Sequence, residues 1–155
     1  MKILVLSDTH GDTGSLLRAA SEEAPELILH LGDHWGDCKP VLEAYPDIPL
    51  RSVRGNCDRP GEAENDEFVV EGKRIFMAHG HQYGVKYRLG DIVNNAMLRC
   101  ADILLFGHTH RPLLTERDGL TIMNPGSLGA SEHTYGLITL GGGSVHCELK
   151  YLYRS

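Results

Sequence analysis

The chain has 155 residues, of which 41% are hydrophobic and 23% are charged, and this composition predicts one globular domain over residues 1–155. Its formal net charge of −6 argues against a nucleic-acid polymer as partner, because phosphate backbones are bound by clustered Lys and Arg side chains. No stretch approaches the ~18 consecutive apolar residues of a membrane span, and the first apolar run is too short for a signal peptide, so we expect a cytoplasmic protein without membrane contact.

The first third of the chain alternates strand and helix patterns. Short apolar runs that end in polar residues predict strands, and apolar residues at helical spacing predict the helices between them. The first helix is expected to begin near Asp12, whose side chain would cap it. Such β-α repeats indicate a largely parallel sheet. The expected strands are Lys2–Ser7, Glu26–Leu31 and Leu50–Arg54, and a second helix is expected over Lys39–Tyr45.

The middle of the chain predicts a hairpin formed by Glu67–Val70 and Arg74–Ala78. An amphipathic helix is expected between Leu89 and Cys100, followed by a buried strand. The C-terminal third is expected to be mostly antiparallel, because its strand patterns are separated by glycine-containing turns. The expected strands after the helix are Asp102–Phe106, Leu113–Arg117, Leu120–Asn124, Tyr135–Leu140 and Val145–Leu152.

Five short clusters of Asp, His and Asn residues each directly follow an expected strand. Loops at strand ends are where α/β sheets present their chemistry. Carboxylate oxygens, an amide oxygen and imidazole nitrogens are suitable ligands for a pair of divalent metals, so we interpret the chain as a two-metal hydrolase of phosphate esters. The candidate metal ligands are Asp8, His10, Asp33, Asn56, His79, His108 and His110.

Asp33 is the candidate bridging ligand, because a carboxylate has two oxygens and bridges two cations, which an imidazole does not do. Sharing one bridge gives each metal about four protein ligands and leaves positions open for water and substrate. Metals about 3.5–4 Å apart would lower the pKa of a bridging water and clamp the phosphoryl oxygens for in-line displacement. We therefore expect two divalent ions per chain and a small phosphate ester as substrate.

In chain order these residues form the motifs D-x-H, G-D, G-N-x-D, H-G-H and G-H-T-H, followed by the turn Asn124-Pro125-Gly126-Ser127. This ordered set resembles the calcineurin-like metallophosphoesterase superfamily, and the small size resembles its short bacterial and archaeal phosphodiesterase branch. The resemblance runs from Asp8 to about Ser127. It implies an α/β fold, a four-layer α/β/β/α sandwich with two central mixed β-sheets.

The family pattern also implies how the ligands divide between two metals. Asn56 would touch the substrate phosphate as well as one metal. Family members commonly use manganese, iron, zinc or nickel, and we expect Mn first, with Ni, Zn, Fe and Mg as alternatives. Relatives in this branch are often dimers or tetramers, so a homo-oligomer stays open. One metal would take Asp8, His10, Asp33 and His110, and the other Asp33, Asn56, His79 and His108.

One position departs from the family pattern. Cys57 stands where many superfamily phosphatases have the histidine that serves as acid for the leaving group. A thiol with a pKa of about 8.5 is a poor substitute for an imidazole near about 6.5. The candidate acids are His81 first, because it lies beside an expected ligand, then His34, Asp58 or metal-bound water. Esters with acidic leaving groups are therefore expected to react faster than alkyl esters.

Three functions are consistent with these motifs. A phosphodiesterase is favoured, because a diester carries one negative charge and the motif set contains few basic residues. A phosphomonoesterase is the first alternative. A protein-trafficking subunit that resembles this fold acts as a binding scaffold and has lost part of the ligand set, so the fold alone does not prove catalysis. Here all seven ligand positions hold competent residues, which argues against a scaffold.

Overall fold

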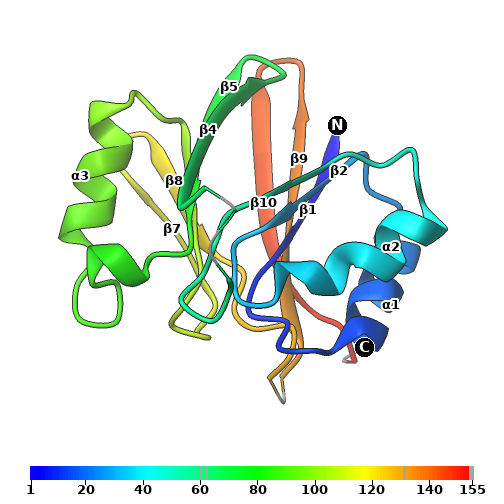
Figure 1. Cartoon of the computed structure of the whole chain (residues 1–155). Coiled ribbons are helices and arrows are strands. Elements are labelled where there is room, and N and C mark those ends of the chain that lie inside the picture. Colours follow the sequence, from blue (N-terminus) through cyan, green and yellow to red (C-terminus); the bar gives the residue numbers. More distant parts are fainter. Residues whose placement is uncertain (60, 62, 131, 154–155) are drawn as a thin grey trace.

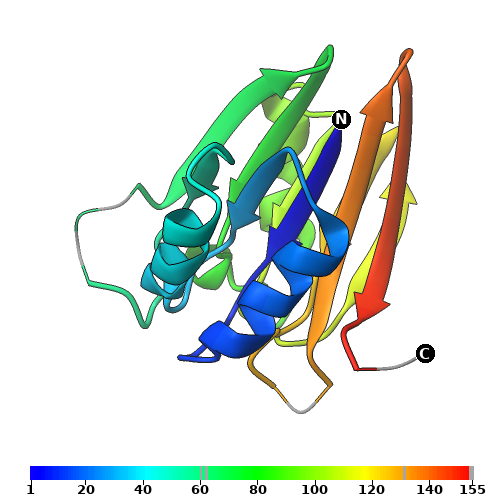
Figure 2. The same cartoon turned by 90° about the vertical axis from the view of Figure 1, so that its right-hand side faces the viewer.

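In this computed structural model the described residues, 1–153 without 60, 62 and 131, form two five-stranded sheets. The sheets pack face to face with α-helices on both outer sides, as Figures 1 and 2 show. The expected four-layer sandwich with two mixed sheets is confirmed. In spatial order the first sheet contains β10 (Ser144–Tyr151), β9 (Thr134–Gly141), β1 (Lys2–Leu6), β2 (Leu27–His30) and β3 (Leu50–Ser52). The second contains β4 (Asn65–Val70), β5 (Lys73–Ala78), β6 (Ile103–Phe106), β8 (Leu120–Asn124) and β7 (Leu113–Arg117).

Helices cover the outer face of each sheet. The two helices of the N-terminal third pack on the first sheet, and the helix between the fifth and sixth strands packs on the second. Short 3-10 turns follow the strands that lead into two of the ligand clusters. The helices are α1 (Thr13–Glu23), α2 (Lys39–Ala44) and α3 (Gly90–Leu98), and the 3-10 turns are η1 (Trp35–Cys38) and η2 (His81–Tyr83).

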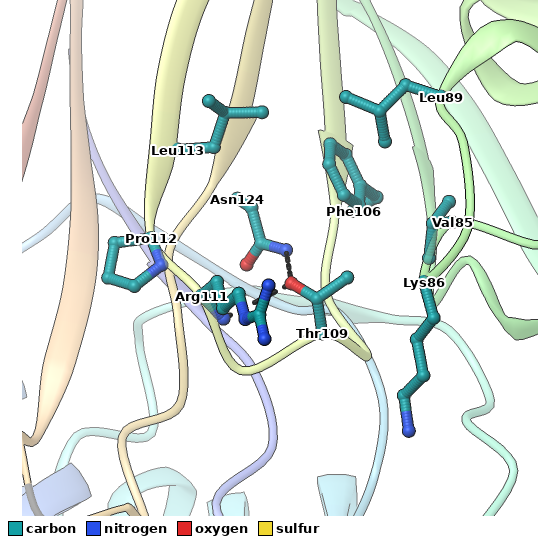
Figure 3. Close-up of a pocket in the computed structure, with 9 residues that line it drawn as sticks. All are labelled: Val85, Lys86, Leu89, Phe106, Thr109, Arg111, Pro112, Leu113 and Asn124. Carbon is teal, nitrogen blue, oxygen red and sulfur yellow. Dashed lines mark hydrogen bonds between the residues drawn. The ribbon is translucent and has the colours of Figure 1, made fainter.

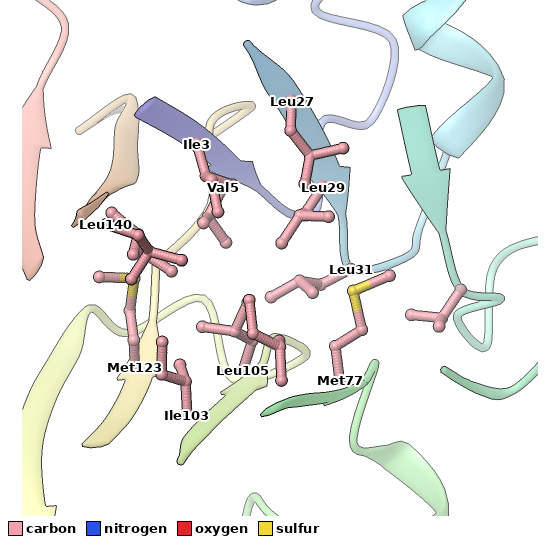
Figure 4. Packing of buried hydrophobic residues seen from close by; sticks show 13 residues of the cluster. Ile3, Val5, Leu27, Leu29, Leu31, Met77, Ile103, Leu105, Met123 and Leu140 are labelled. Carbon is pink, nitrogen blue, oxygen red and sulfur yellow. The ribbon is translucent and has the colours of Figure 1, made fainter. Parts of the chain in front are cut away.

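The central strands are buried on both faces, and their side chains alternate between two cores. In β1, Ile3 and Val5 point toward the opposite sheet, whereas Leu4 and Leu6 contact the helices, and all four are 0% exposed. Figure 4 shows the cluster between the sheets, to which both sheets contribute. Because both faces are buried, the sequences of these strands are continuous apolar runs. The same packing holds the strand ends in place relative to one another.

The strand pairing follows the sequence predictions with two additions. The predicted hairpin is present, and its first strand begins at Asn65, two residues earlier than expected. In the C-terminal third β7 pairs with β8 and β9 with β10, both antiparallel as expected. β8 also pairs in parallel with β6, and β9 returns to the first sheet beside β1. Within the described residues, no helix combines the length and the apolar character needed to cross a membrane.

Helix α1 is anchored at both ends. Asp12 caps its N-terminus, as predicted, by accepting a hydrogen bond from the Ser15 backbone amide at 3.0 Å. At the other end Glu23 is 6% exposed, and its carboxylate accepts hydrogen bonds from Lys150 Nζ at 2.8 Å and the Tyr135 hydroxyl at 3.2 Å. Burial alone would raise the pKa of Glu23, but the hydrogen bond and charge of Lys150 outweigh it and hold this pKa below its ordinary value.

Replacing Glu23 by Gln is expected to flatten the acid dependence of folding stability. Because the folded pKa is depressed, the carboxylate stabilises the fold above its ordinary pKa of 4.5, and this contribution is lost as the pH falls through the folded value. Urea unfolding at pH 7 and pH 3 should show a larger loss of unfolding free energy for the wild type than for Glu23→Gln. Glu22→Gln, which removes the exposed partner of Arg18, should follow the wild type. Equal pH dependence of the wild type and Glu23→Gln would contradict this assignment.

Candidate metal centre

The predicted ligands lie together where strands of both sheets end. β1 and β2 lead into Asp8 and Asp33, and β5 and β6 lead into His79 and His108. Two groups of side chains place one ligand atom per residue within 4.8 Å of one another, and each group could hold a metal ion. The first group is Asp8, His10, Asp33 and His110, and the second is Asp33, His79 and His108.

Asp33 faces both groups. Its Oδ2 lies 3.8 Å from His10 Nε2 and 3.4 Å from His79 Nε2. Asn56 lies beside the second group, with its Oδ1 3.0 Å from His79 Nε2. His108 Nδ1 is 3.2 Å from the same nitrogen of His79. The structure therefore brings all seven predicted ligands close together, with Asp33 common to both groups.

The chemistry of this donor set fits divalent cations. Asp8 is 0% exposed and Asp33 is 2% exposed, and His110 Nε2 lies 3.1 Å from Asp8 Oδ1. Burying two neighbouring carboxylates is unfavourable unless positive charge compensates them. Imidazole nitrogens and carboxylate oxygens are the donors that first-row transition metals bind in proteins. The residues present therefore suit a metal site better than a purely structural cluster.

Burial and neighbouring charges shift the pKa values of the cluster's members in opposite directions. Burial raises the pKa of Asp8 above its ordinary value. Burial also acts on Asp33, but the hydrogen bond and charge of His79 outweigh it and hold the pKa of Asp33 well below its usual range. Burial, with the charges of His79 and Lys86, lowers the pKa of His108 to about 4. A neutral His108 is the form that binds a metal.

Hydrogen bonds from outside the cluster orient two of the ligands. His79 Nδ1 lies 2.8 Å from the carbonyl oxygen of Leu31. A proton on Nδ1 donates to this oxygen and leaves Nε2 free to bind a metal. The backbone amide of Cys57 donates to Asp33 Oδ1 at 2.8 Å, so that Oδ2 faces the histidines. The loops after β2, β3 and β5 are thereby fixed relative to one another.

Asp58, one of the predicted acids, binds backbone rather than facing the ligand groups. Its carboxylate accepts hydrogen bonds from the backbone amides of Asp33 at 2.8 Å, His34 at 2.7 Å and Gly55 at 2.8 Å. These contacts join the loop after β2 to the loop after β3. Because every one of them uses a carboxylate oxygen as acceptor, they support a positioning role for Asp58 rather than proton donation.

Asp58→Ala is expected to destabilise the fold and to displace Asp33. Three backbone amides would lose their acceptor, and we expect the free energy of unfolding in urea to fall by about 2–4 kcal/mol. Asp58→Asn keeps the volume and one acceptor oxygen, so its loss should be about half as large. Metal binding to the folded variants should weaken in the same order. An alanine variant within 0.5 kcal/mol of the wild type, on the order of the scatter for surface changes, would contradict this role.

The remaining predicted acids lie beside the ligand groups. The ring centroid of His81 is 5.5 Å from that of His79, and His34 lies 5.1 Å from His10. Burial and the charge of His79 lower the pKa of His81. Burial and neighbouring carboxylates raise the pKa of Cys57, so its thiol is a weaker acid than an ordinary cysteine. Both histidines therefore lie beside the ligand groups, whereas the raised pKa of Cys57 makes its thiol a poor proton donor.

Asn124 was not predicted as a site residue, and the structure places its side chain against the ligand loop between β6 and β7. Its side-chain amide donates to the carbonyl oxygen of Gly107 at 3.1 Å and to Thr109 Oγ1 at 2.9 Å. Ser127 Oγ donates to the carbonyl oxygen of Asp8 at 2.7 Å. The turn that contains Asn124 and Ser127 therefore supports two ligand loops. The only indication of this role in the sequence was that the turn Asn124-Pro125-Gly126-Ser127 accompanies the family motifs.

Comparison with known proteins identifies the family. The Calcineurin-like phosphoesterase superfamily domain matches residues 1–142. The chain belongs to this superfamily. The probable metallophosphoesterase YsnB of Bacillus subtilis is 32% identical over 148 residues, which cover 90% of this chain and 85% of YsnB. Phosphodiesterase YfcE of Escherichia coli is 28% identical over 167 residues, which cover 89% of this chain and 87% of YfcE. The resemblance indicated by the motifs is confirmed.

Solved structures of different proteins share the superfamily fold. A Streptococcus pneumoniae protein described as a predicted phosphoesterase has a TM-score of 0.81 at 22% identity, with 97% of this chain and 89% of that chain covered. Vps29 of Entamoeba histolytica, complexed with Zn²⁺, has a TM-score of 0.71 at 21% identity, with 98% and 99% covered. At these identities the likeness establishes the fold alone. The function of a calcineurin-like chain must therefore be argued from its site.

Proposed function

We propose that this chain is a phosphodiesterase that holds two divalent metal ions. The observation that carries the proposal is Asp33, whose carboxylate faces both ligand groups at the edge where the two sheets meet. One ion would be held by the first group, and the other by the second group together with Asn56. When bound, two such ions supply Lewis acidity and an activated water for in-line attack on phosphorus.

The chain's own residues bind, orient and exchange protons around the phosphate. The Asn56 amide directs its oxygen at the second ligand group, and its Nδ2 donates one hydrogen to Cys57 Sγ at 3.7 Å, which leaves the other amide hydrogen for a phosphate oxygen. His81, beside the same group, is the first candidate to protonate the leaving oxygen, with His34 and water as alternatives. Hydrogen bonds to Leu31 and Cys57 hold the histidine and carboxylate ligands in one orientation throughout.

Two alternatives use the same fold. A phosphomonoesterase would use the same ligands, and the similarity to a protein named as a phosphodiesterase supports the diester instead. A binding scaffold is suggested by the likeness to Vps29. The scaffold is less well supported, because here every predicted ligand lies within reach of the others. Rates of diester and monoester hydrolysis, measured with bound metal, distinguish the phosphodiesterase, the phosphomonoesterase and the scaffold.

The deciding experiment measures hydrolysis of bis-p-nitrophenyl phosphate and p-nitrophenyl phosphate by metal-stripped protein with Mn, Ni, Zn, Fe or Mg added back. We expect diester hydrolysis to require metal, to be fastest with Mn and to exceed monoester hydrolysis. His108→Ala should lose at least about 100-fold in kcat/KM, and the exposed control His146→Ala should match the wild type.

Other outcomes of that experiment choose between the alternatives. A faster reaction with the monoester would favour a phosphomonoesterase. Absence of activity with every metal, while elemental analysis finds two ions bound per chain, would favour the scaffold. Absence of bound metal would overturn the metal site itself.

The cellular setting stays a proposal. We expect a single domain over residues 1–155 that works in the cytoplasm on a small phosphate ester, with neither a nucleic-acid polymer nor a membrane as partner. A homo-oligomer, dimer or tetramer, stays open, and light scattering of the eluted protein would determine it. These expectations rest on the sequence and on the family resemblance.

A further inference from the structure

A cleft of about 660 Å³ lies beside the loop that carries His108 and His110 and has no role in the proposed reaction so far. It lies on the α3 side of the second sheet, between the segment before α3 and the ends of β6, β7 and β8 (Figure 3). We propose that this cleft binds a ring-bearing ester group, aryl or nucleoside, of a phosphodiester whose phosphate lies at the metal centre. The inference rests on the proposed function and names its substrate class.

One part of the cleft is apolar. Val85, Leu89, Phe106 and Leu113 line it, and Figure 3 shows them with Leu89 and Leu113 on opposite walls. Phe106 is only 1% exposed and belongs to the core cluster beneath α3, so the cleft has a fixed aromatic floor. A volume of this size lies within the ~300–1,000 Å³ of small-molecule pockets, and such a lining suits the faces of a flat ring.

The part of the cleft next to the ligand loop is polar and positive. Lys86, Thr109 and Arg111 lie below the apolar residues in the view of Figure 3. Thr109 Oγ1 accepts hydrogen bonds from Asn124 Nδ2 and from the Arg111 backbone amide, so its hydroxyl hydrogen is available to a ligand. In the part of the chain that the structure describes, neither cation forms an ion pair with a carboxylate. These groups favour a ring attached to an anion.

Two lining residues connect the cleft with the ligand loops. Thr109 stands between the ligands His108 and His110, and Val85 packs against Gly80, next to the ligand His79, where an added Cβ would lie 2.9 Å from Val85 Cγ2. A second cleft of about 480 Å³ includes His34 and Cys57 and is formed by loops of the first sheet. Residues of the ligand loops thus line one cleft on each sheet. A diester has two ester groups to place and a monoester has one, so the two clefts suit a diester.

Binding of two phosphonates tests the cleft without any turnover. Phenylphosphonate and methylphosphonate present the same anion to the metal centre and differ only in the ring, and neither contains an ester bond to hydrolyse. By titration calorimetry of the Mn-loaded protein we expect the phenyl compound to bind about tenfold more tightly, because the cleft removes its ring from water. Equal Kd values for the two ligands would overturn the proposal.

Two variants locate the binding to the cleft. Leu89→Trp fills it from one wall and should reduce the phenyl preference to below about threefold, while the methyl Kd stays unchanged. Leu113→Trp fills it from the opposite wall and replaces the first variant if that one does not fold. Leu98→Trp, at an 83% exposed position of α3, is the matched control and should keep the full preference. A control that loses the preference equally would overturn the assignment to this cleft.

A kinetic comparison separates this inference from the proposed function. Thymidine 5′-(p-nitrophenyl) phosphate and methyl p-nitrophenyl phosphate release the same leaving group, and we expect about tenfold higher kcat/KM for the nucleoside ester. Leu89→Trp should bring this ratio near one. If no diester reacts while the phenyl preference persists, the proposed function fails and the cleft stands. If both esters react equally and both phosphonates bind equally, the cleft fails and the phosphodiesterase stands.

Discussion

Replacing Asp33 by alanine is expected to strip the protein of metal and to lower kcat/KM for bis-p-nitrophenyl phosphate by at least about 1,000-fold, or ~4 kcal/mol of transition-state stabilisation. Asp33 belongs to both ligand groups, with Oδ2 3.4 Å from His79 Nε2 and 3.8 Å from His10 Nε2. Without it the first group keeps only the Asp8 carboxylate. The second group keeps only neutral donors, which hold a divalent cation poorly without a carboxylate beside them.

Elemental analysis after gel filtration measures this effect independently of activity. We expect Asp33→Ala to hold well under one ion per chain. His110→Ala removes a ligand of the first group only and should lose about half of the metal. Asp47→Ala, at an exposed turn position after α2, controls for the loss of an acidic residue and should match the wild type in both assays. An Asp33→Ala protein that keeps its metal and its activity within about tenfold would refute a shared carboxylate.

The location of the site was predictable because strand ends are readable in a sequence. Apolar runs that stop at Ser7, Leu31 or Phe106 and continue into Asp, Gly and His residues mark the ends of buried strands. The C-terminal ends of parallel strands meet at one edge of a sheet, so the loops that follow β1 and β2 lie together, as do those that follow β5 and β6. The packing of the two sheets then brings these two edges together, and His110 Nε2 lies 3.1 Å from Asp8 Oδ1.

The pairing partners of the C-terminal strands were not predictable from periodicity. The apolar pattern of Leu120–Asn124 predicts a strand, but it does not predict that this strand pairs between β6 and β7. The same is true of β9, which crosses to the first sheet and pairs with β1. A period of two residues reports which face of a strand is buried, and both sheets offer an equally apolar face.

The backbone conformation of the ligand loops could not be predicted from the sequence either. Positive φ angles in non-glycine residues are uncommon and unfavourable, and here several fall on the ligands or their neighbours. Surrounding hydrogen bonds, such as those of Asp58 and Asn124, compensate for this conformation. Such contacts depend on loop paths that only the three-dimensional structure shows. The residues concerned are Asp8, His10, Asp33, His34, His108 and His110.

The close approach of the two sheets at the metal centre leads to a second large expected effect, from Gly107→Ala. A Cβ at Gly107 would collide with Ser7 Oγ and would lie 2.9 Å from Asp8 Oδ2. Ser7 and Asp8 are both 0% exposed at the end of β1, so neither side chain has room to move away. The ends of β1 and β6 must separate instead. We expect kcat/KM to fall about 100-fold and the free energy of unfolding by about 1–3 kcal/mol.

Two further variants show whether space at the metal centre causes the loss. At Gly90, at the start of α3, an added Cβ would have no atom within 4 Å. Gly90→Ala should therefore keep full activity, and its free energy of unfolding should rise by up to about 1 kcal/mol because alanine has the higher helix propensity. Ser7→Ala removes the nearest colliding atom, so combining it with Gly107→Ala should recover part of the lost stability beyond additivity. If Gly107→Ala behaved like Gly90→Ala, the distance between the strand ends would not set the geometry of Asp8. If the double variant were strictly additive, the loss would arise from the backbone of Gly107 and not from its contact with β1.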